Sequence, residues 1–501
     1  MKKIAKFKKE IIISLLLIGS YFLTRIIRLT LIPIFTDEAI YVRWAEIARY
    51  DAAWRFIPLA DGKQPLFVWL AMVILPLFSD PLFAGRLVSV LAGLGTMVGL
   101  FLLSWRLFGK RQIGFLAAGL YLLYPFALVY DRMALMDGLV GMFAVWALLF
   151  EVLLVQTLRL DVALILGMIV GGGILTKSSG FFNLYLLPFS LLLFPWQDKQ
   201  RTKKLLLWLG LALIVVIESQ MMYLVLRLSP LFNMIAEKNN VFIYPFKEWL
   251  GHPFRFVLGN LRGLWDWFIG YFSWPVFGLL AFSVITIWRY FREKALLLVW
   301  FGAPFLALAL FGRVLYPRFV FSMTLSLLPL TALSLGQLFN LLKKPWLIAF
   351  ISLLLASFWI RSDWQLLTDP YTADIPKADK GQYLNDWPAG GGVSEVVAFL
   401  NKESKKGEIY VATEGTFGLL PYALEVYLYK NHQVEIHGFW PLKTEIPEEV
   451  RESAKVKPTY FVLYQTQEIP LGWPLKLIAK YRKGVGDVYL QLCQVINLDE
   501  D

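Results

Sequence analysis

The stretch GRLVSVLAGLGTMVGLFLLSWRLFG, residues 85–109, carries no charged side chain between Arg86 and Arg106. A transmembrane helix needs about 20 consecutive, mostly apolar residues, and the uncharged part of this stretch has that length. Similar apolar runs recur along the first 361 residues. They lie near residues 10–32, 83–105, 112–130, 136–156, 161–176, 180–196, 204–226, 264–288, 295–311, 318–341 and 345–361. The sequence therefore predicts a mainly α, polytopic bundle of about eleven membrane-spanning helices.

The composition of the whole chain agrees with a membrane bundle and indicates a separate soluble part. Hydrophobic residues make up 58% of the 501 residues and charged residues only 17%, whereas soluble domains are about 25% charged. Residues 1–361 hold 35 Lys and Arg against 17 Asp and Glu, and residues 362–501 hold 14 against 20. Because the basic excess is dispersed over membrane loops, we expect membrane lipids and no nucleic acid as partners. The acidic residues 362–501 are predicted to be soluble.

Basic loops predict which side of the membrane each segment faces. The N-terminus MKKIAKFKKE is followed by an apolar run without a small-residue cleavage site, which predicts an uncleaved first membrane helix. The run QPLFVWLAMVILPLF, residues 64–78, is short and contains Pro65 and Pro76, so we expect an interfacial helix rather than a span. The basic loops and the N-terminus then all fall on one side, which the positive-inside rule assigns to the cytoplasm.

This topology predicts a multi-pass protein of the cell membrane with two domains. Residues 1–361 form the membrane domain, and its first outer loop, residues 33–82, lies outside the cytoplasm. Residues 362–501 form a small extracytoplasmic domain. In the first outer loop, Ile40, Trp44 and Ile47 recur at helical spacing, while Arg43, Glu46 and Arg49 face away from them. That spacing predicts a short amphipathic helix at the membrane surface.

Residues 362–501 alternate helix-like and strand-like segments. Alternating apolar residues predict strands in GEIYVAT, VEIHGF, TYFVLYQT and VYLQLCQV. The segments SEVVAFLNKES and LLPYALEVYLYKN have helical periodicity. The order of these segments predicts a small α/β fold. The chain has one cysteine and three histidines, none spaced as HxxxH, so little supports a zinc-hydrolase site.

Acidic residues stand at two places that the predicted topology brings to the same outer face. Asp37 and Glu38 lie in IFTDEAIYVRWAEIA, residues 34–48, and Asp137 lies in YDRMALMDGLVG, residues 130–141. Acids at the start of a helix also serve as caps or balance the helix dipole, so a purely structural role for Asp37 is an alternative. Ionisable residues at the rim of a membrane bundle are costly, which favours a functional role.

Basic residues are predicted at that same face. They are Arg132, Lys177 in ILTKSSGFF, and Arg313 and Arg318 in FGRVLYPRF. Each of them, taken alone, could be a side chain that extends toward lipid head groups. Taken together, the acids and cations suit a reaction in which a lipid-borne phosphate leaves and a hydroxyl attacks. The cations would stabilise charge on the phosphate, and a carboxylate would accept the proton.

Five segments, in their order along the chain, resemble a known family. They are TDEAIYVRWA, GKQPLFVWL, the stretch at residues 85–109, YDRMALMDG and GGGILTKSSG. This order is similar to that of the GT-C superfamily of membrane glycosyltransferases, in the branch of protein O-mannosyltransferases and the lipid A aminoarabinose transferase. The resemblance spans roughly residues 20–200. The later RVLYPRF also resembles an arginine-containing segment of those enzymes.

The resemblance implies roles for individual residues. Asp37 would be the base that activates the acceptor, Glu38 would position acceptor or donor, and Asp137 would support the same site. Four cations would contact the phosphate of the donor: Lys63, Arg132, Lys177 and Arg318. Two residues depart from the family pattern, since Gln64 stands where a proline is usual and Ser178 where a glycine follows the lysine. These departures put the fine geometry in doubt without changing the charge.

The implied reaction is inverting transfer of a sugar from a polyprenyl-phosphate donor to a hydroxyl of a protein, lipid or glycan. No cofactor is expected with certainty. No GxxxxGK[ST] loop for a nucleotide occurs, and the resemblance leaves open whether a divalent metal assists at the acidic pair. A transporter or flippase of a lipid-linked sugar is one alternative, although the acids cluster at one face rather than at the midplane. A receptor-like or scaffold protein is another, and it would leave the rim charges unexplained.

Overall fold

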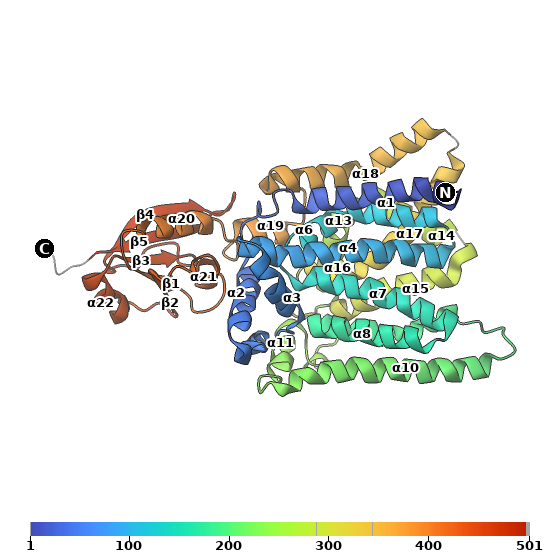
Figure 1. Cartoon of the computed structure of the whole chain (residues 1–501), viewed down its shortest axis with the longest axis horizontal. Coiled ribbons are helices and arrows are strands. Elements are labelled where there is room, and N and C mark those ends of the chain that lie inside the picture. Colours follow the sequence, from blue (N-terminus) through green and yellow to red (C-terminus); the bar gives the residue numbers. More distant parts are fainter. Residues whose placement is uncertain (1, 287, 343, 497–501) are drawn as a thin grey trace.

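The computed structural model describes residues 2–286, 288–342 and 344–496, which form a helical bundle with a smaller sheet-containing part at one end (Figure 1). The N-terminus lies at the far end of the bundle, and the C-terminal strands lie beyond its other end (Figure 1). The predicted class, a mainly α membrane bundle with a small C-terminal α/β part, is confirmed.

Within the described residues, six helices or helical segments are long and apolar enough to cross a membrane. They are α4 (Pro81–Phe108), α7 (Met136–Thr157), α10 (Arg201–Leu224), α15 (Phe291–Phe311), α16 (Arg318–Thr324) joined to α17 (Leu328–Leu341), and α18 (Pro345–Thr368). Two bent pairs raise the number to at most 8. These pairs are α5 (Arg111–Leu123) with α6 (Pro125–Asp131), bent by 65°, and α13 (Val257–Phe272) with α14 (Trp274–Thr286), bent by 101°.

The predicted number of about eleven spans is therefore not confirmed. Helix α8 (Leu160–Thr176) and the broken helical segment at residues 178–193 are apolar, but each is shorter than a full span. Helix α1 (Lys2–Ile26) has the length of a span and runs along the bundle (Figure 1), but charged residues near both of its ends leave it outside these six. Apolar runs in the sequence thus include short and broken helices that pack within the bundle.

Two short helices within residues 33–82 lie at the end of the bundle that faces the sheet. Helix α2 (Thr36–Tyr50) runs across the bundle axis, and α3 (Leu66–Ile74) lies beside it (Figure 1). Nine residues of α3 extend only about 14 Å, so α3 cannot cross a hydrocarbon core of about 30 Å. Ile40 and Trp44 are buried, as their spacing predicts. Glu46 was predicted to face away from them, but it is buried as well because α21 packs on α2.

The C-terminal part contains a five-stranded sheet in the order β2-β1-β3-β5-β4. Its elements are α20 (Val393–Glu403), β1 (Ile409–Glu414), α21 (Tyr422–Leu428), β2 (Val434–Phe439), α22 (Glu448–Val456), β3 (Thr459–Leu463), β4 (Leu475–Arg482) and β5 (Tyr489–Val495). Strands β2, β1 and β3 are parallel to one another. Strand β5 pairs antiparallel with β3, and β4 pairs antiparallel with β5. The four predicted strands are present. Strand β4 was missed because this edge strand, LKLIAKYR, is largely exposed and does not alternate apolar and polar residues.

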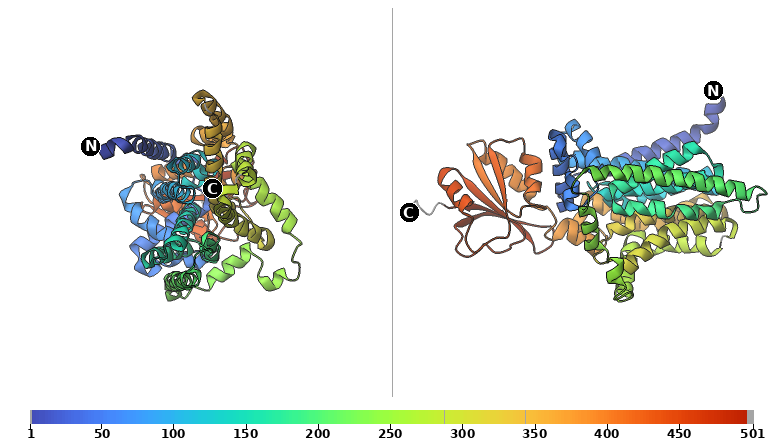
Figure 2. Two further views of the ribbon diagram at one scale, coloured as in Figure 1. Left: turned by 90° about the vertical axis from the view of Figure 1, so that its right-hand side faces the viewer. Right: turned by 90° about the horizontal axis from the view of Figure 1, so that it is seen from below.

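The two parts share one hydrophobic core. Ile34, Ala39 and Leu82 of the membrane part pack with apolar residues of α20 and α21. The right-hand view of Figure 2 also shows α2 between the bundle and the sheet. The domain boundary predicted after residue 361 falls inside α18, which continues to Thr368. Residues 369–392, including α19 (Lys377–Lys380), then run along the end of the bundle before α20 begins.

Candidate active site

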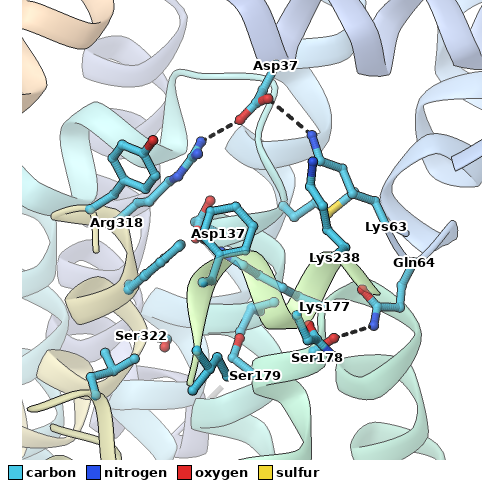
Figure 3. Close-up of a pocket in the computed structure, with 18 of the residues that line it drawn as sticks. Asp37, Lys63, Gln64, Asp137, Lys177, Ser178, Ser179, Lys238, Arg318 and Ser322 are labelled. Carbon is cyan, nitrogen blue, oxygen red and sulfur yellow. Dashed lines mark hydrogen bonds and ion pairs between the residues drawn. The ribbon is translucent and has the colours of Figure 1, made fainter. Parts of the chain in front are cut away.

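A cavity of about 1090 Å³ lies at the end of the bundle beside α2. Its wall combines α2, the turn at residues 62–64, the starts of α7 and α16, the turn after α8, α11 (Met234–Phe242), α15 and residues 378–388. Charged side chains meet in this cavity, and Ser178, Ser179 and Ser322 lie on the side away from Asp37 (Figure 3). Segments that are far apart in the sequence therefore build one site.

Asp37 stands in the first turn of α2 and receives two cations. Lys63 Nζ lies 3.1 Å from its Oδ1, and Arg318 Nη1 lies 2.7 Å from its Oδ2 (Figure 3). Burial by itself would raise the pKa of Asp37, but the charges of Lys63 and Arg318 outweigh burial and lower this pKa below its ordinary value. Asp37 is therefore an anion held between two cations, as long as both cations stay in place.

Asp137 and Lys177 form a second ion pair in the same cavity. Asp137 lies in the first turn of α7, and Lys177 directly follows α8, so two helix ends bring the pair together. Lys177 Nζ lies 2.6 Å from Asp137 Oδ1 and 4.7 Å from the ring centre of Phe319. The structure thus places Asp37, Asp137, Lys63, Lys177 and Arg318 around one space, and their proposed roles stay predictions.

Lys63 is also tied to a lysine that the sequence reasoning missed. The Asp61 carboxylate lies 3.3 Å from Lys63 Nζ and 2.6 Å from Lys238 Nζ. Gly62, which lies between Asp61 and Lys63 in the chain, has φ +61°. A Cβ on this residue would lie 2.2 Å from the Met234 carbonyl oxygen, so α11 packs directly on Gly62. Lys238 belongs to IAEKNNVF, a polar segment without a recognisable motif, and only the fold brings it to the cavity.

The two departures from the family pattern contact each other. Gln64 Nε2 donates a hydrogen bond to Ser178 Oγ over 2.7 Å (Figure 3). This bond links the turn before α3 to the turn after α8, and both turns carry a cavity lysine next to the bonded residue. The two residues that depart from the family pattern are therefore paired with each other in this chain.

Glu38 follows Asp37 directly but does not line the cavity. Its Oε1 accepts from Arg86 Nε and the Ala134 N–H, and its Oε2 accepts from Arg86 Nη2 and the Phe35 N–H, over 2.6–3.0 Å. Glu38 and Arg86 have side chains that are 0% exposed. The predicted contact of Glu38 with acceptor or donor does not fit this arrangement, because four donors already occupy the carboxylate. For the same reason, Asp37 and Glu38 do not fit a shared divalent ion.

Arg132 likewise lies outside the cavity. Its guanidinium donates to the carbonyl oxygens of residues 24, 25, 27 and 28, where α1 ends, over 2.7–3.1 Å. A helix end leaves carbonyl groups without partners, and Arg132 satisfies them. The predicted phosphate contact of Arg132 does not fit, because this side chain caps α1 inside the protein.

Other parts of the cavity wall are apolar or aromatic. Val140, Ala144, Leu186, Trp300 and Pro304 line it from membrane helices and from the segment after α8. Trp387 and Pro388 line it from the side of the sheet part. The Thr36 N–H and hydroxyl both donate to the Pro388 carbonyl oxygen, over 3.1 and 2.9 Å, and this fixes the wall beside Asp37.

Comparisons with known proteins agree with this architecture. Residues 62–223 match the family model described as dolichyl-phosphate-mannose-protein mannosyltransferase. A comparison with curated protein sequences finds no match. The structure of ArnT from Cupriavidus metallidurans in the apo state is similar at a TM-score of 0.62 and 15% identity, covering 98% of this chain and 99% of that chain.

Two further solved structures are similar. ArnT from the same organism, bound to undecaprenyl phosphate, matches at a TM-score of 0.60 and 16% identity, with 98% of each chain covered. The archaeal oligosaccharyltransferase AglB from Archaeoglobus fulgidus, in complex with an inhibitory peptide and a dolichol-phosphate, matches at 0.51 and 14% identity, covering 91% of this chain and 70% of that chain. These comparisons give no support to the transporter alternative. The resemblance noted from the sequence is confirmed at the level of the fold: the chain has the fold of these solved structures, and its residues 62–223 match the mannosyltransferase family model.

Proposed function

We propose that this protein transfers a hexosyl or pentosyl group from a polyprenyl-phosphate sugar to an acceptor hydroxyl at the outer face of the cell membrane. One observation carries the proposal: a cavity at the end of a membrane bundle joins four cations, two of its carboxylates in ion pairs with them, to an apolar wall. A lipid phosphate has the matching parts, because its chain suits the apolar wall and its phosphate suits the cations.

The cations would bind and stabilise the leaving phosphate. Lys63, Lys177, Lys238 and Arg318 all line the cavity. Charge develops on the phosphate as its bond to the sugar breaks, and fixed cations in a partly enclosed site stabilise that charge. The matched structure bound to undecaprenyl phosphate supports this assignment by analogy.

Asp37 is proposed as the general base, with Asp137 in support. Both carboxylates line the cavity, and Asp37 stands on the side toward Trp387 and Pro388, where the sheet part completes the wall. An acceptor hydroxyl that enters from this side would meet Asp37 together with its two partners, Lys63 and Arg318. The base would take the hydroxyl proton while the hydroxyl oxygen attacks the anomeric carbon from the face opposite the phosphate.

We further propose the membrane orientation and the division into domains. The N-terminus is placed in the cytoplasm, and the cavity and residues 362–501 are placed outside, because the basic loops then share the cytoplasmic side. The sheet part contributes to the acceptor side through Trp387, which lines the cavity and is 47% exposed. An exposed aromatic ring at a rigid wall offers a surface on which an acceptor group can stack.

The test uses purified protein in lipid nanodiscs with polyprenyl-phosphate sugars and a membrane extract as the source of acceptor. We expect release of polyprenyl phosphate by the wild type and loss of release in Asp37→Asn. Asp161→Asn is the matched control, because Asp161 is an exposed acid at the start of α8, and it should release lipid phosphate like the wild type. Movement of the lipid across the bilayer without release would contradict the proposal and favour a flippase.

A further inference from the structure

Asp37 and the donor phosphate need the same cations. Lys63 and Arg318 are the two cations paired with Asp37, at 3.1 and 2.7 Å, and both line the cavity in which the phosphate is proposed to bind. A carboxylate that is paired with two cations is a poor proton acceptor, because both cations stabilise its anionic form. In the arrangement that the structure shows, the groups proposed to bind the phosphate thus suppress the proposed base.

We infer that the donor phosphate displaces Asp37 from Lys63 and Arg318, so that donor binding releases Asp37 to act as the base. This inference rests on the proposed function. It makes Asp37 a carboxylate that is switched on by substrate, and it predicts that donor binds before the acceptor is activated.

The two cations are built to change partners. Lys63 keeps other partners when it leaves Asp37, since Asp61 lies 3.3 Å away and the ring centre of Tyr41 lies 4.7 Å away. Arg318 lies over the ring of Tyr316 at 5.0 Å. Its Nε is buried and has no hydrogen-bond partner within the described residues, although a buried donor normally has one. This unused donor at the cavity indicates a ligand with acceptor oxygens.

The neighbouring Glu38 shows what a carboxylate without this freedom looks like. Its oxygens accept from two backbone N–H groups as well as from Arg86, and a backbone donor cannot move to a ligand. Within the part of the chain that the structure describes, the hydrogen-bond partners of the Asp37 carboxylate are two side chains on flexible stems, Lys63 and Arg318. A phosphate can therefore replace Asp37 as the partner of its cations, but it cannot replace Glu38 in the same way.

Charge and atoms balance through a full cycle. The acceptor O–H proton passes to Asp37, the acceptor oxygen bonds to the anomeric carbon, and the bond from that carbon to the phosphate oxygen breaks. The electron pair stays on the phosphate, which changes from a diester with one negative charge to a monoester with up to two. When the product lipid phosphate leaves, Lys63 and Arg318 return to Asp37, and the proton passes to water.

The experiment measures equilibrium binding of a polyprenyl monophosphate to the whole protein in nanodiscs, without acceptor. We expect Asp37→Asn to bind at least tenfold more tightly than the wild type, because no carboxylate competes for Lys63 and Arg318. Asp386→Asn is the matched control: Asp386 lines the same cavity, but no ion pair of its carboxylate occurs among the described residues. It should stay within about threefold of the wild type, which accounts for the general effect of one lost charge.

Other outcomes separate the exchange from the proposed function. Equal affinities of Asp37→Asn and wild type, with transfer retained by the wild type, would overturn the exchange and leave the function standing. Equal tightening in Asp386→Asn would also overturn it, since the effect would then be unspecific. Absence of binding in every protein would overturn the proposed function itself. Asp37→Ala provides the same comparison if the asparagine variant does not fold.

Discussion

Two groups of charged residues lie side by side at the end of the bundle. They differ in whether the carboxylate can exchange its present partners for a ligand. In the cavity, the side chains of Asp37, Lys63 and Arg318 are 15%, 15% and 10% exposed and contact one another through flexible stems. Behind the cavity wall, Glu38 and Arg86 are fully buried, and every oxygen of Glu38 is occupied twice. One step along α2 thus separates an acid that can change partners from one that cannot.

The largest expected effect follows from replacing the acid on the cavity side. Asp37→Asn should lower the rate of sugar transfer by about 10²–10⁴-fold, the range of a general base, while the protein stays folded. The rate of polyprenyl phosphate release, measured with unchanged thermal unfolding in detergent, checks this. A variant that is folded and transfers at the wild-type rate would remove Asp37 from the chemistry.

Replacing the neighbouring acid should affect the fold instead. Glu38→Gln leaves Arg86 as a buried charge without its counterion, and breaking such a pair costs about 3–5 kcal/mol. We expect a lower unfolding temperature but near-normal transfer per folded molecule. The opposite pattern, a normal unfolding temperature with lost transfer, would show that Glu38 takes part in the reaction as Asp37 does, which would contradict this comparison.

The same contrast applies to the cations. Lys63→Met should raise the KM for the donor by about 10–100-fold, because a hydrogen bond between charged groups is worth about 1.5–3 kcal/mol. Arg132→Met should leave that KM unchanged and lower stability, because Arg132 caps α1. Donor titrations with both variants decide the matter, and a raised KM in Arg132→Met would place this arginine at the phosphate after all.

Glu46 extends the comparison to a buried acid with incomplete partners. Burial raises the pKa of Glu46 to about 8, against the opposing charge of Arg43, and its Oε1 has no partner within the described residues. The folded protein holds the Glu46 proton more tightly than the unfolded chain does. Protonated Glu46 therefore adds to the free energy of unfolding at low pH, and this stabilisation declines as the pH rises toward 8. Stability should fall by about 1–2 kcal/mol between pH 6 and 8, whereas Glu46→Gln should flatten the profile. Identical profiles in thermal unfolding would refute this.

The smallest expected effect concerns the bond between Gln64 and Ser178. Gln64→Ala and Ser178→Ala should each lower transfer by less than about tenfold, as a single hydrogen bond is worth about 0.5–1.5 kcal/mol. The double variant should be no worse than the more affected single variant, because both remove the same bond. Fully additive losses in a double-mutant cycle would show that the two residues act independently.

Much of this arrangement could be predicted from local patterns. Long uncharged runs identify the membrane bundle, and the order of short motifs brings Asp37, Lys63, Asp137, Lys177 and Arg318 to one face. The number of spans could not be predicted, because α8 and the segment after it have the composition of a span without its length. An apolar composition shows that a helix avoids water, but it does not show whether the helix is long enough to cross the membrane.

The site shows the same limit at the level of single residues. Adjacent acids look alike in a sequence. Only the hydrogen bonds from the Ala134 N–H and from Arg86 of α4 show that Glu38 is unavailable to a ligand. Arg132 has the residue type and sequence position expected of a phosphate ligand, but its guanidinium donates its hydrogen bonds to carbonyl oxygens at the end of α1. Lys238 reaches the cavity, and its ion pair with Asp61 forms, through packing of α11 on Gly62, for which no sequence signal exists.

The most direct test of the account is a structure of this protein with a polyprenyl monophosphate bound in nanodiscs. We expect the phosphate in the cavity, with its oxygens in hydrogen-bond contact with Lys63 and Arg318, and with Asp37 no longer paired with either cation. The bond network of Glu38 and Arg86 should be unchanged. A phosphate bound elsewhere, or bound while both ion pairs of Asp37 persist, would contradict the account.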